Sequence, residues 1–307
     1  MWRDARRVRG VLGGLNTTGP ARRLLFALAT SAGWERAVRV LPGGERSAYR
    51  LARPYVAGPR LEDALACAHR LAHEGLTSSI DLFGEGVFDS SEADRAADSY
   101  VELADSLVRA PEQTFLSIDL SHIGVDGTAG EVQRRLERIA AALPEGRRIQ
   151  VGAEEERRAE LILAAVLAAA RAGGAVSATV QANLKRSHAD AHILAGAGVP
   201  IRLVKGAYVE DPRVAQPWGE ATDLAFLELA HELHAGRAEV ALATHDPVLR
   251  EALLRGLPDV GVEMLLGVRA ADASSLVARG VPVRIYVPFG DAWFRYAMRR
   301  WAESMGR

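Results

Sequence analysis

The chain has 307 residues, enough to bury a large core, and a formal net charge of −1. Its 38 Lys and Arg residues are balanced by 39 Asp and Glu residues, so charge gives no reason to expect nucleic-acid binding. Cys67 is the only cysteine, which excludes an internal disulfide and a thiolate metal cluster. No apolar run reaches the length of a membrane span. We expect a soluble, unprocessed cytoplasmic protein.

The first 76 residues predict helices and no strands. A basic start precedes a helix over 21–41 and a second helix over 60–74, with loops at Pro42-Gly43-Gly44 and over 54–59. We expect residues 1–76 to form a helical cap packed on the following domain. The basic residues suit a solvated or packed helix best, and contact with anionic lipid is the alternative. They are Arg3, Arg6, Arg7, Arg9, Arg22 and Arg23.

From Thr77 onward, short β-branched runs alternate with alanine-rich amphipathic stretches, which is the rhythm of a parallel sheet with crossover helices. The predicted strands are 78–83, 114–120, 148–152, 176–181, 201–205, 239–244, 261–266 and 283–287. This pattern favours a (β/α)₈ barrel over 77–307 rather than an open sheet.

In such a barrel, functional side chains collect where the strands end. Polar residues do follow the predicted strands, although most strand positions are apolar. Gln181 and Arg202 lie within strands, and facing inward they would be costly without polar partners. The others are Asp81, Glu85, Asp119, Glu154, Lys205, Thr244, His245, Glu263 and Tyr286.

The helix after the last predicted strand carries a second polar group. Tyr296, Arg299, Arg300 and Glu303 lie at helical spacing, within about two turns of one another. Two neighbouring guanidinium groups offer forked donors that suit a carboxylate ligand. The alternative is a solvated helix face, but the position directly after a strand favours a site.

The order of these motifs resembles that of the FAD-dependent proline dehydrogenase family. The matching segments are DLFGE at 81–85, VQA at 180–182, IRLVKGAY at 201–208, ATHDP at 243–247, MLLGV at 264–268, IYVPFGDAW at 285–293 and YAMRRWAE at 296–303. They follow the family order across the whole predicted barrel. The VKGAY segment and the Y-x-x-R-R-x-x-E pattern are the specific ones.

The resemblance implies a distorted barrel that holds FAD at its mouth without a glycine-rich dinucleotide loop, and no G-x-G-x-x-G motif occurs here. It implies that Gln181 and Arg202 lie at the isoalloxazine ring, where a positive charge stabilises the reduced anionic flavin. Further cofactor contacts are implied for Val204, Lys205, Gly206, Ala207, Tyr208, Thr222, Thr244, His245 and Glu303. No metal is expected.

The implied substrate is a small cyclic amino acid. By resemblance, Arg299 and Arg300 hold its carboxylate, Glu85 orients one of the two arginines, and Tyr286 and Tyr296 form aromatic walls. The reaction would move a hydride from the carbon beside a secondary ring nitrogen to flavin N5 and leave a cyclic imine. The amine must first be neutral, which a nearby carboxylate or an apolar site would favour.

Several positions depart from the family pattern. Asp119 stands where the family has a lysine, and Gly152 where it has an aspartate. Asn183 replaces a tyrosine and Glu263 replaces a glutamine. We hypothesise that Asp119 contacts a donor on a modified ring amino acid. The alternative is a compensated exchange with Gly152, in which Asp119 makes only a local hydrogen bond.

Three functions remain open from the sequence. Oxidation of proline or of another cyclic secondary amino acid is favoured, and a flavin-binding protein without turnover is the second. The third is another barrel chemistry, with His245 and Asp246 as a possible metal pair. The electron acceptor is also open: a membrane quinone, reached by a peripheral contact at the inner membrane face, or oxygen or a soluble carrier.

Overall fold

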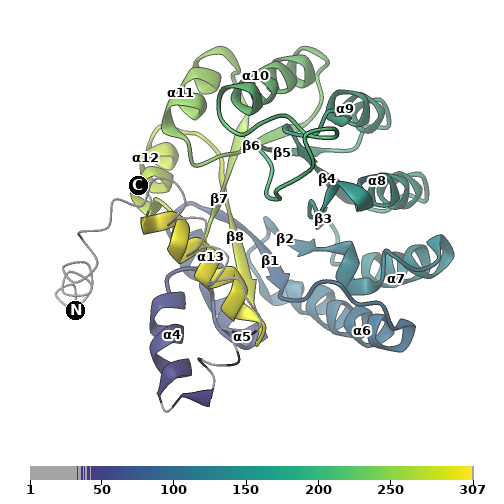
Figure 1. Ribbon diagram of the computed structural model, residues 1–307, viewed down its shortest axis with the longest axis vertical. Helices are drawn as coiled ribbons and strands as arrows, with labels where there is room; N and C mark the ends of the chain where they lie inside the picture. The colour runs from purple at the N-terminus through teal and green to yellow at the C-terminus, as the bar shows by residue number, and fades with distance from the viewer. Residues whose placement is uncertain (1–32, 34–35, 37, 39, 42, 306–307) are drawn as a thin grey trace. The chain divides into compact units, whose positions relative to one another are not determined.

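A computed structural model describes residues 33, 36, 38, 40, 41 and 43–305. The chain divides into two units, one of Val56–Asp291 and one of Met1–Tyr55 with Ala292–Arg307. The position of one unit relative to the other is not determined, so each is described by itself (Figure 1). The arginine-rich start and nearly all of the helix predicted over 21–41 lie outside the described residues.

The larger unit is a closed barrel of parallel strands in sequential order, which confirms the predicted (β/α)₈ fold (Figure 1). The strands are β1 Thr77–Leu82, β2 Thr114–Ile118, β3 Ile149–Val151, β4 Val176–Gln181, β5 Ile201–Val204, β6 Val240–Ala243, β7 Gly261–Leu265 and β8 Val283–Phe289. The predicted bounds differ from these by no more than 2 residues. β2 ends early because a 3₁₀ turn, η2 (Leu120–Ile123), follows Asp119. β8 runs longer because Pro288 and Phe289 pair with β1.

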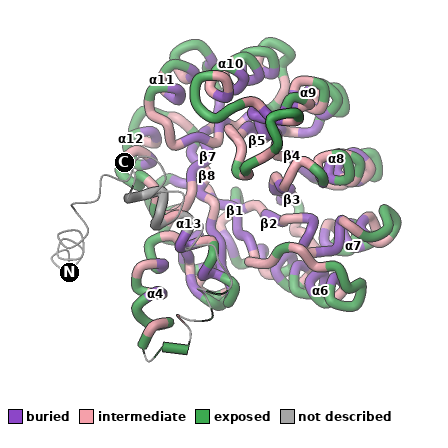
Figure 2. Tube along the Cα trace, viewed as in Figure 1, coloured by how far each residue is buried: buried purple, intermediate pink, exposed green. Residues whose placement is uncertain are grey.

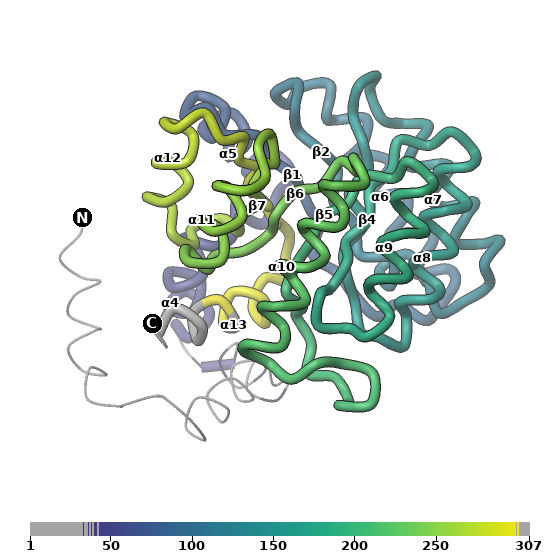
Figure 3. The backbone as a smooth tube through the Cα atoms, turned by 90° about the horizontal axis from the view of Figure 1, so that it is seen from above, coloured from purple at the N-terminus to yellow at the C-terminus, as the bar shows by residue number. Residues whose placement is uncertain are grey.

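Helices surround the barrel, and Figures 1 and 3 agree that α6, α7, α8 and α9 follow one another around it. The ring consists of α6 Ser90–Ser106, α7 Ala129–Ala141, α8 Glu156–Arg171, α9 Ser187–Gly196, α10 Glu220–Ala235, α11 Pro247–Gly256 and α12 Ala270–Ala278, with a short 3₁₀ turn η1 at Leu107–Arg109. α5 (Leu61–His73) packs against β1 and β8. The strands are buried and the outward helix faces are exposed, as amphipathic helices on a sheet require (Figure 2).

N-terminal capping residues fix where the helices α7 and α11 begin, and so where the loops that precede them at the barrel mouth end. Thr128 and Glu131 form a capping box at the start of α7. Asp246 accepts from the backbone N–H groups of Val248 and Leu249, with Pro247 at the first turn of α11. Each such cap is worth about 1 kcal/mol. Since Asp246 directly follows Thr244 and His245, its cap fixes the conformation of the β6 strand end.

The interior of the barrel is unusually polar. In β4, Val176, Ala178 and Val180 alternate with Ser177 and Thr179, and the polar set faces inward, as the period of a strand requires. The Ser177 hydroxyl lies 2.9 Å from Gln150 Oε1, and the Thr179 hydroxyl donates to the Val151 carbonyl at 2.7 Å. Most (β/α)₈ barrels fill this space with branched apolar side chains. Here hydrogen bonds across neighbouring strands replace part of that apolar packing.

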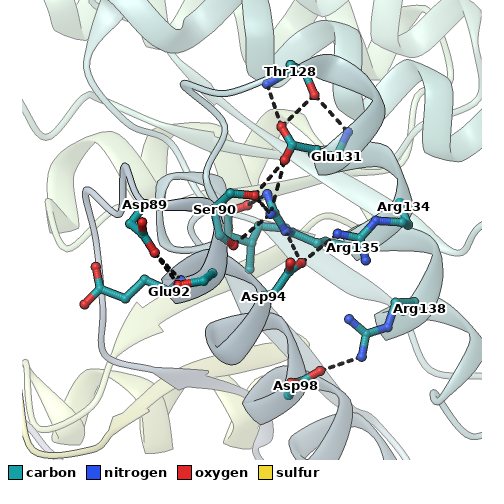
Figure 4. Close-up of polar contacts among 12 residues, drawn as sticks. Asp89, Ser90, Glu92, Asp94, Asp98, Thr128, Glu131, Arg134, Arg135 and Arg138 are labelled. Atoms are coloured by element: carbon teal, nitrogen blue, oxygen red, sulfur yellow. Dashed lines mark hydrogen bonds and ion pairs between the residues drawn. The ribbon is translucent and has the colours of Figure 1, made fainter.

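A buried arginine joins α6 to α7 (Figure 4). Arg135 is 1% exposed, and its guanidinium donates to Asp94 at 2.8 Å, to the Ser90 carbonyl at 3.0 Å and to the Ile123 carbonyl at 3.2 Å. Ser90 begins α6 and Ile123 ends η2, so Arg135 ties together the chain segments that follow β1 and β2. These segments carry Glu85 and Asp119.

The smaller unit holds α4 (Gly44–Ala52) packed against α13 (Trp293–Met305). Tyr49 meets Trp293 edge to face, with ring centroids 5.1 Å apart. The sequence did not predict α4, because Gly43 and Gly44 indicate a loop. Gly43 does adopt a left-handed conformation with φ 75°, but the helix begins directly after it. None of the helices in the described part of the chain is both long and apolar enough to span a membrane.

Candidate active site

The ends of β3, β4 and β5 are joined through Gln181. This side chain is 5% exposed and donates from Nε2 to the Glu154 carbonyl at 2.8 Å. Its Oε1 accepts from the Ala207 backbone N–H at 3.2 Å. An amide that is satisfied on both sides holds one orientation. Gln181 therefore fixes the start of the loop after β5 over the barrel mouth.

The connection after β5, residues 205–219, lies against the turn after β4. The Asn183 N–H donates to the Lys205 carbonyl at 2.9 Å, and the Gln216 N–H donates to the Asn183 carbonyl at 2.6 Å. Gly206 has φ 133°, and a Cβ atom there would fall on the Asn183 side-chain amide. Asn183 Oδ1 is buried and has no hydrogen-bond partner in the described structure. A glycine backbone and an unsatisfied acceptor thus lie side by side at the mouth.

Lys205 is held by two carboxylates. Its Nζ lies 2.6 Å from Asp223 Oδ1 and 3.0 Å from Asp246 Oδ2. Burial lowers the pKa of Lys205, but the hydrogen bonds to Asp223 and Asp246 outweigh it and the pKa is raised. From the sequence, Asp246 was considered only as a metal ligand beside His245, and Asp223, which follows Thr222, had no expected role. The Lys205 ammonium group is therefore charged and held in one position, as a phosphate ligand must be.

Thr244, His245 and Thr222 contact backbone groups. The Leu265 N–H donates to His245 Nε2 at 3.0 Å, so in neutral His245 the ring hydrogen is on Nδ1. The Thr244 hydroxyl accepts from the Asp246 N–H at 3.2 Å. The Thr222 hydroxyl is buried within α10 and donates to the Pro217 carbonyl at 2.9 Å. His245 thus has a defined tautomer, and a cofactor contact by Thr222 stays a prediction.

Arg202 points into the barrel from β5, with Val204 two residues further along the same face. Its Nε donates to the Thr179 hydroxyl at 2.9 Å, and its Nη1 lies 3.6 Å from Glu263 Oε2. A largely buried positive charge needs polar partners. The structure supplies them from β4 and β7.

Asp81, at the end of β1, is 4% exposed. Burial raises its pKa to about 6, while hydrogen bonds from Tyr286 and Ser117 act in the opposite direction. The Ser117 hydroxyl donates to Asp81 Oδ2 at 3.0 Å. Tyr286 thus reaches a carboxylate on the neighbouring strand, as its position on β8 beside β1 allows.

Asp119 lies at the end of β2, beside Gly152 at the end of β3. Burial raises its pKa well above the ordinary value, and the carboxylates of Asp81 and Glu154 raise it further, whereas Arg202 lowers it. Asp119 stands where the family has a lysine, and an ionised carboxyl would place a negative charge there. The surroundings instead favour the neutral, protonated carboxyl. Asp119 Oδ1 also occupies the place that a Cβ atom at residue 152 would take.

Glu85 is exposed on the loop after β1, and this loop is anchored on both sides. The Gly86 N–H donates to the Ser121 hydroxyl at 3.1 Å, and the Ser121 N–H donates to Glu154 Oε1 at 2.8 Å. His122 covers Gly84 so closely that a Cβ atom there would overlap its ring. Burial lowers the pKa of His122 to about 4, so the ring is neutral. Residue 85 is therefore held at a defined place on the mouth.

The predicted carboxylate clamp lies on α13, in the smaller unit. The Arg300 guanidinium lies over the Tyr296 ring, 5.4 Å from its centroid, a cation–π contact. The side chains of Arg299 and Glu303 lie outside the described part of the structure. How this clamp meets Glu85 and Tyr286 therefore stays a prediction, as do the cofactor contacts of Tyr208 and Glu303.

Comparison with known proteins identifies the family. The model of the family described as proline dehydrogenase matches residues 64–306. The chain belongs to the proline dehydrogenase family. Proline dehydrogenase of Deinococcus radiodurans is 31% identical over 272 residues, which cover 83% of this chain and 87% of that protein. Proline dehydrogenase 1 of Bacillus subtilis (strain 168) is 28% identical over 260 residues, covering 82% and 86% of the two chains.

A solved structure shares the fold of this chain. Proline utilization A from Bdellovibrio bacteriovorus, inactivated by N-propargylglycine, superposes with a TM-score of 0.79 at 19% identity. The match covers 92% of this chain and 36% of that one, so this chain spans about a third of the larger protein's length. The family resemblance read from the motifs is confirmed, and so is the fold.

Members of the family use FAD, and the residues at the barrel mouth fit this cofactor. Asn183 Oδ1 is a buried acceptor that a hydroxyl of the ribityl chain would satisfy. Lys205 supplies a fixed cation for a phosphate, and Gly206 leaves space where a side chain would block close approach. Arg202 and Gln181 bring a positive charge and an amide to the same edge. Asn183 had no assigned role before the structure placed it beside Gly206.

Proposed function

We propose that this chain oxidises proline to pyrroline-5-carboxylate, with bound FAD accepting the hydride. One observation carries the proposal: Gln181, Arg202 and the Gly206-Ala207 backbone gather at one edge of the barrel, in a chain that matches the proline dehydrogenase family over 64–306. Another barrel chemistry, such as a lyase or metal-dependent hydrolase, has no comparable support.

The proposed substrate site uses the arginines of α13. Arg299 and Arg300 would hold the substrate carboxylate with forked hydrogen bonds, and Glu85 would orient one of them. The cation–π contact between Arg300 and Tyr296 supports this, because it already restricts the guanidinium plane. Tyr286 and Tyr296 would form the apolar walls around the ring.

Proline at neutral pH carries a secondary ammonium group, which must lose a proton before hydride transfer. We propose that Asp81 accepts it: the N–H bond breaks, an O–H bond forms on the carboxylate, and the amine becomes neutral. A pKa of about 6 leaves Asp81 ionised at neutral pH and close enough to the working pH to release the proton again. Its hydrogen bonds to Ser117 and Tyr286 keep the carboxylate in place.

A second substrate class is favoured by Asp119. A protonated carboxyl can donate a hydrogen bond, so it would suit a ring amino acid with an extra acceptor, such as a hydroxyl group. The purified protein, loaded with FAD, should be mixed without oxygen with L-proline, 4-hydroxyproline, pipecolate and simple amines. Loss of the oxidised flavin absorption with proline supports the main proposal. Loss only with another ring amino acid assigns Asp119 to substrate choice, and no loss with any of them indicates flavin binding without turnover.

Asp119→Lys tests the role of the altered strand end. If Asp119 has replaced a cation that grips the substrate carboxylate, the variant should reduce its flavin faster with proline and have a lower KM. No gain with proline counts against an altered clamp and favours a local role beside Gly152. Far-ultraviolet circular dichroism and thermal unfolding show whether the variant remains folded.

We further propose a membrane quinone as electron acceptor, reached by a peripheral contact at the cytoplasmic face. The support is the basic cluster at the start of the sequence, Arg3 to Arg9, which suits an anionic surface. Sedimentation with vesicles containing an anionic lipid, compared with neutral vesicles, tests the contact. Faster flavin reoxidation by a quinone in those vesicles than by oxygen tests the acceptor.

A further inference from the structure

Three charged side chains follow one another inside the barrel. Glu263, on β7, is 8% exposed and lies between two guanidinium groups. Its Oε2 is 3.6 Å from Arg202 Nη1, and its Oε1 is 4.0 Å from Arg284 Nε. Glu263 and Arg284 are register partners on neighbouring strands. One buried carboxylate is therefore shared by two largely buried arginines.

Arg284 does not depend on Glu263 for its position. Its Nη1 donates to the Ser78 carbonyl at 2.8 Å and to the Gln113 carbonyl at 2.6 Å. Its guanidinium also lies over the Phe115 ring, 3.4 Å from the centroid. Burial lowers the pKa of Arg284 to about 10, so it is still charged at neutral pH. Arg284 is thus a cation beside Glu263 that is held in place by groups other than that carboxylate.

Arg202 has a different environment. Its Nε contacts the neutral hydroxyl of Thr179 at 2.9 Å, and the ion pair found for it in the described structure is the one with Glu263. In a buried site, a carboxylate this close offsets much of the field that a guanidinium would exert on its other side. Glu263 therefore offsets part of the charge that Arg202 presents to the barrel mouth, and the Asp81 carboxylate also acts on that guanidinium.

We infer that Glu263 is a positioning residue that lowers the reduction potential of the bound FAD by offsetting the charge of Arg202. The inference rests on the proposed function and on the family resemblance, which implies that Arg202 lies at the isoalloxazine ring. Reduction adds negative charge to the flavin, and a nearby cation stabilises the reduced form. A carboxylate paired with that cation reduces the stabilisation. The buried Glu263 carboxylate would thus make the reduction potential of bound FAD more negative than Arg202 alone would make it.

The test is the midpoint potential of the flavin in wild type and in Glu263→Gln, measured by equilibration with a reference dye. Glutamine keeps the shape and a hydrogen-bonding oxygen but removes the charge. The potential should become more positive, with about a tenfold shift of the equilibrium toward reduced flavin, or about 30 mV for a two-electron couple. Glu263→Asp keeps the charge but withdraws it from Arg202, and should give a smaller shift in the same direction.

Glu239→Gln is the matched control. Glu239 forms a salt bridge of 2.6 Å with Arg148, but its side chain is 66% exposed, so the same charge loss should leave the potential unchanged. If Glu263 only holds the fold together, Glu263→Gln should lower the melting temperature without moving the potential, and that result overturns the inference. A more negative flavin potential in Glu263→Gln than in wild type would also overturn the inference. If Glu263→Gln does not fold, the inference stands or fails on the Glu263→Asp potential.

Different results would overturn the proposed function and the inference about Glu263. Wild-type protein that retains no FAD would overturn the proposed function, and this inference with it. A flavin-loaded Glu263→Gln protein with the wild-type potential would overturn this inference alone. The potential measurements do not require that proline reduces the flavin, because equilibration with the dye requires only bound flavin.

Discussion

The carboxyl oxygen Oδ1 of Asp119 fills the space beside Gly152 that a side chain at residue 152 would need. The two departures from the family pattern at the ends of β2 and β3 are therefore one structural feature. A carboxyl group is present at this part of the mouth, but β2 supplies it and β3 makes room for it. This supports the compensated exchange that the sequence left as an alternative, while the substrate role of Asp119 remains to be tested.

This relationship predicts coupling between the two positions. Gly152→Ala should destabilise the protein by about 1–3 kcal/mol, because the new Cβ atom forces Asp119 from its place. In an Asp119→Ala background the same change should cost little, since the overlapping oxygen is gone. Denaturant unfolding of the four proteins measures the interaction energy. Additive effects would show that Asp119 and Gly152 are independent.

The raised pKa of Asp81 predicts a pH dependence of stability. An unfolded aspartate has a pKa near 3.9, and folded Asp81 has a pKa of about 6, so the folded protein binds more protons between these values. Its contribution to stability is fully present below about pH 4 and is lost as the pH rises through 6, by on the order of 2–3 kcal/mol.

Asp81→Asn should remove the contribution of Asp81 to the pH dependence of the free energy of unfolding. Relative to the variant, wild type should lose stability between pH 4 and pH 6, as measured by urea unfolding at a series of pH values. Asp98→Asn, at an exposed position on α6, should keep the wild-type slope. Parallel curves for wild type and Asp81→Asn would mean that Asp81 is not protonated in the folded protein in this range.

The glycine in the KGAY segment predicts a local requirement of the cofactor loop. Gly206→Ala combines a positive φ of 133° with overlap on the Asn183 amide, so we expect FAD affinity to fall at least about tenfold. Gly219→Ala is the control, because φ there is 103° but a Cβ atom would meet open space. Fluorescence titration with FAD compares them. Equal losses would point to backbone strain in the loop rather than to the contact with Asn183.

The contacts of Arg135 predict that it stabilises the fold more than its neighbours do. Arg135→Ala removes the guanidinium that donates to the buried Ile123 carbonyl, and loss of that donor should cost about 1–3 kcal/mol. Arg138→Ala, which breaks a surface pair with Asp98, should change the melting temperature little. Thermal unfolding of both variants is the measurement. A similar small effect for both would show that the α6–α7 contact holds without Arg135.

The sequence by itself determined the barrel and the family. Strand and helix periods are local properties, so the eight strands were predicted to within 2 residues. The KGAY and Y-x-x-R-R-x-x-E segments identified the family because each keeps several chemically specific residues at fixed spacing. α4 was missed because local glycines suggest a loop, while its packing against α13 depends on residues far along the chain.

Only the tertiary structure decided which charges meet. Glu263 is separated by 61 residues in numbering from Arg202, and no local pattern indicates that they pair. The two carboxylates at Lys205, the place of Asn183 beside Gly206 and the contact of Asp119 with Gly152 likewise join residues from different elements of the fold. Burial then shifts the pKa of Asp81 and Asp119, because desolvation depends on what surrounds a group in space. The sequence determined which residues lie at the strand ends. The closed barrel determined which of them contact one another and how burial shifts their pKa values.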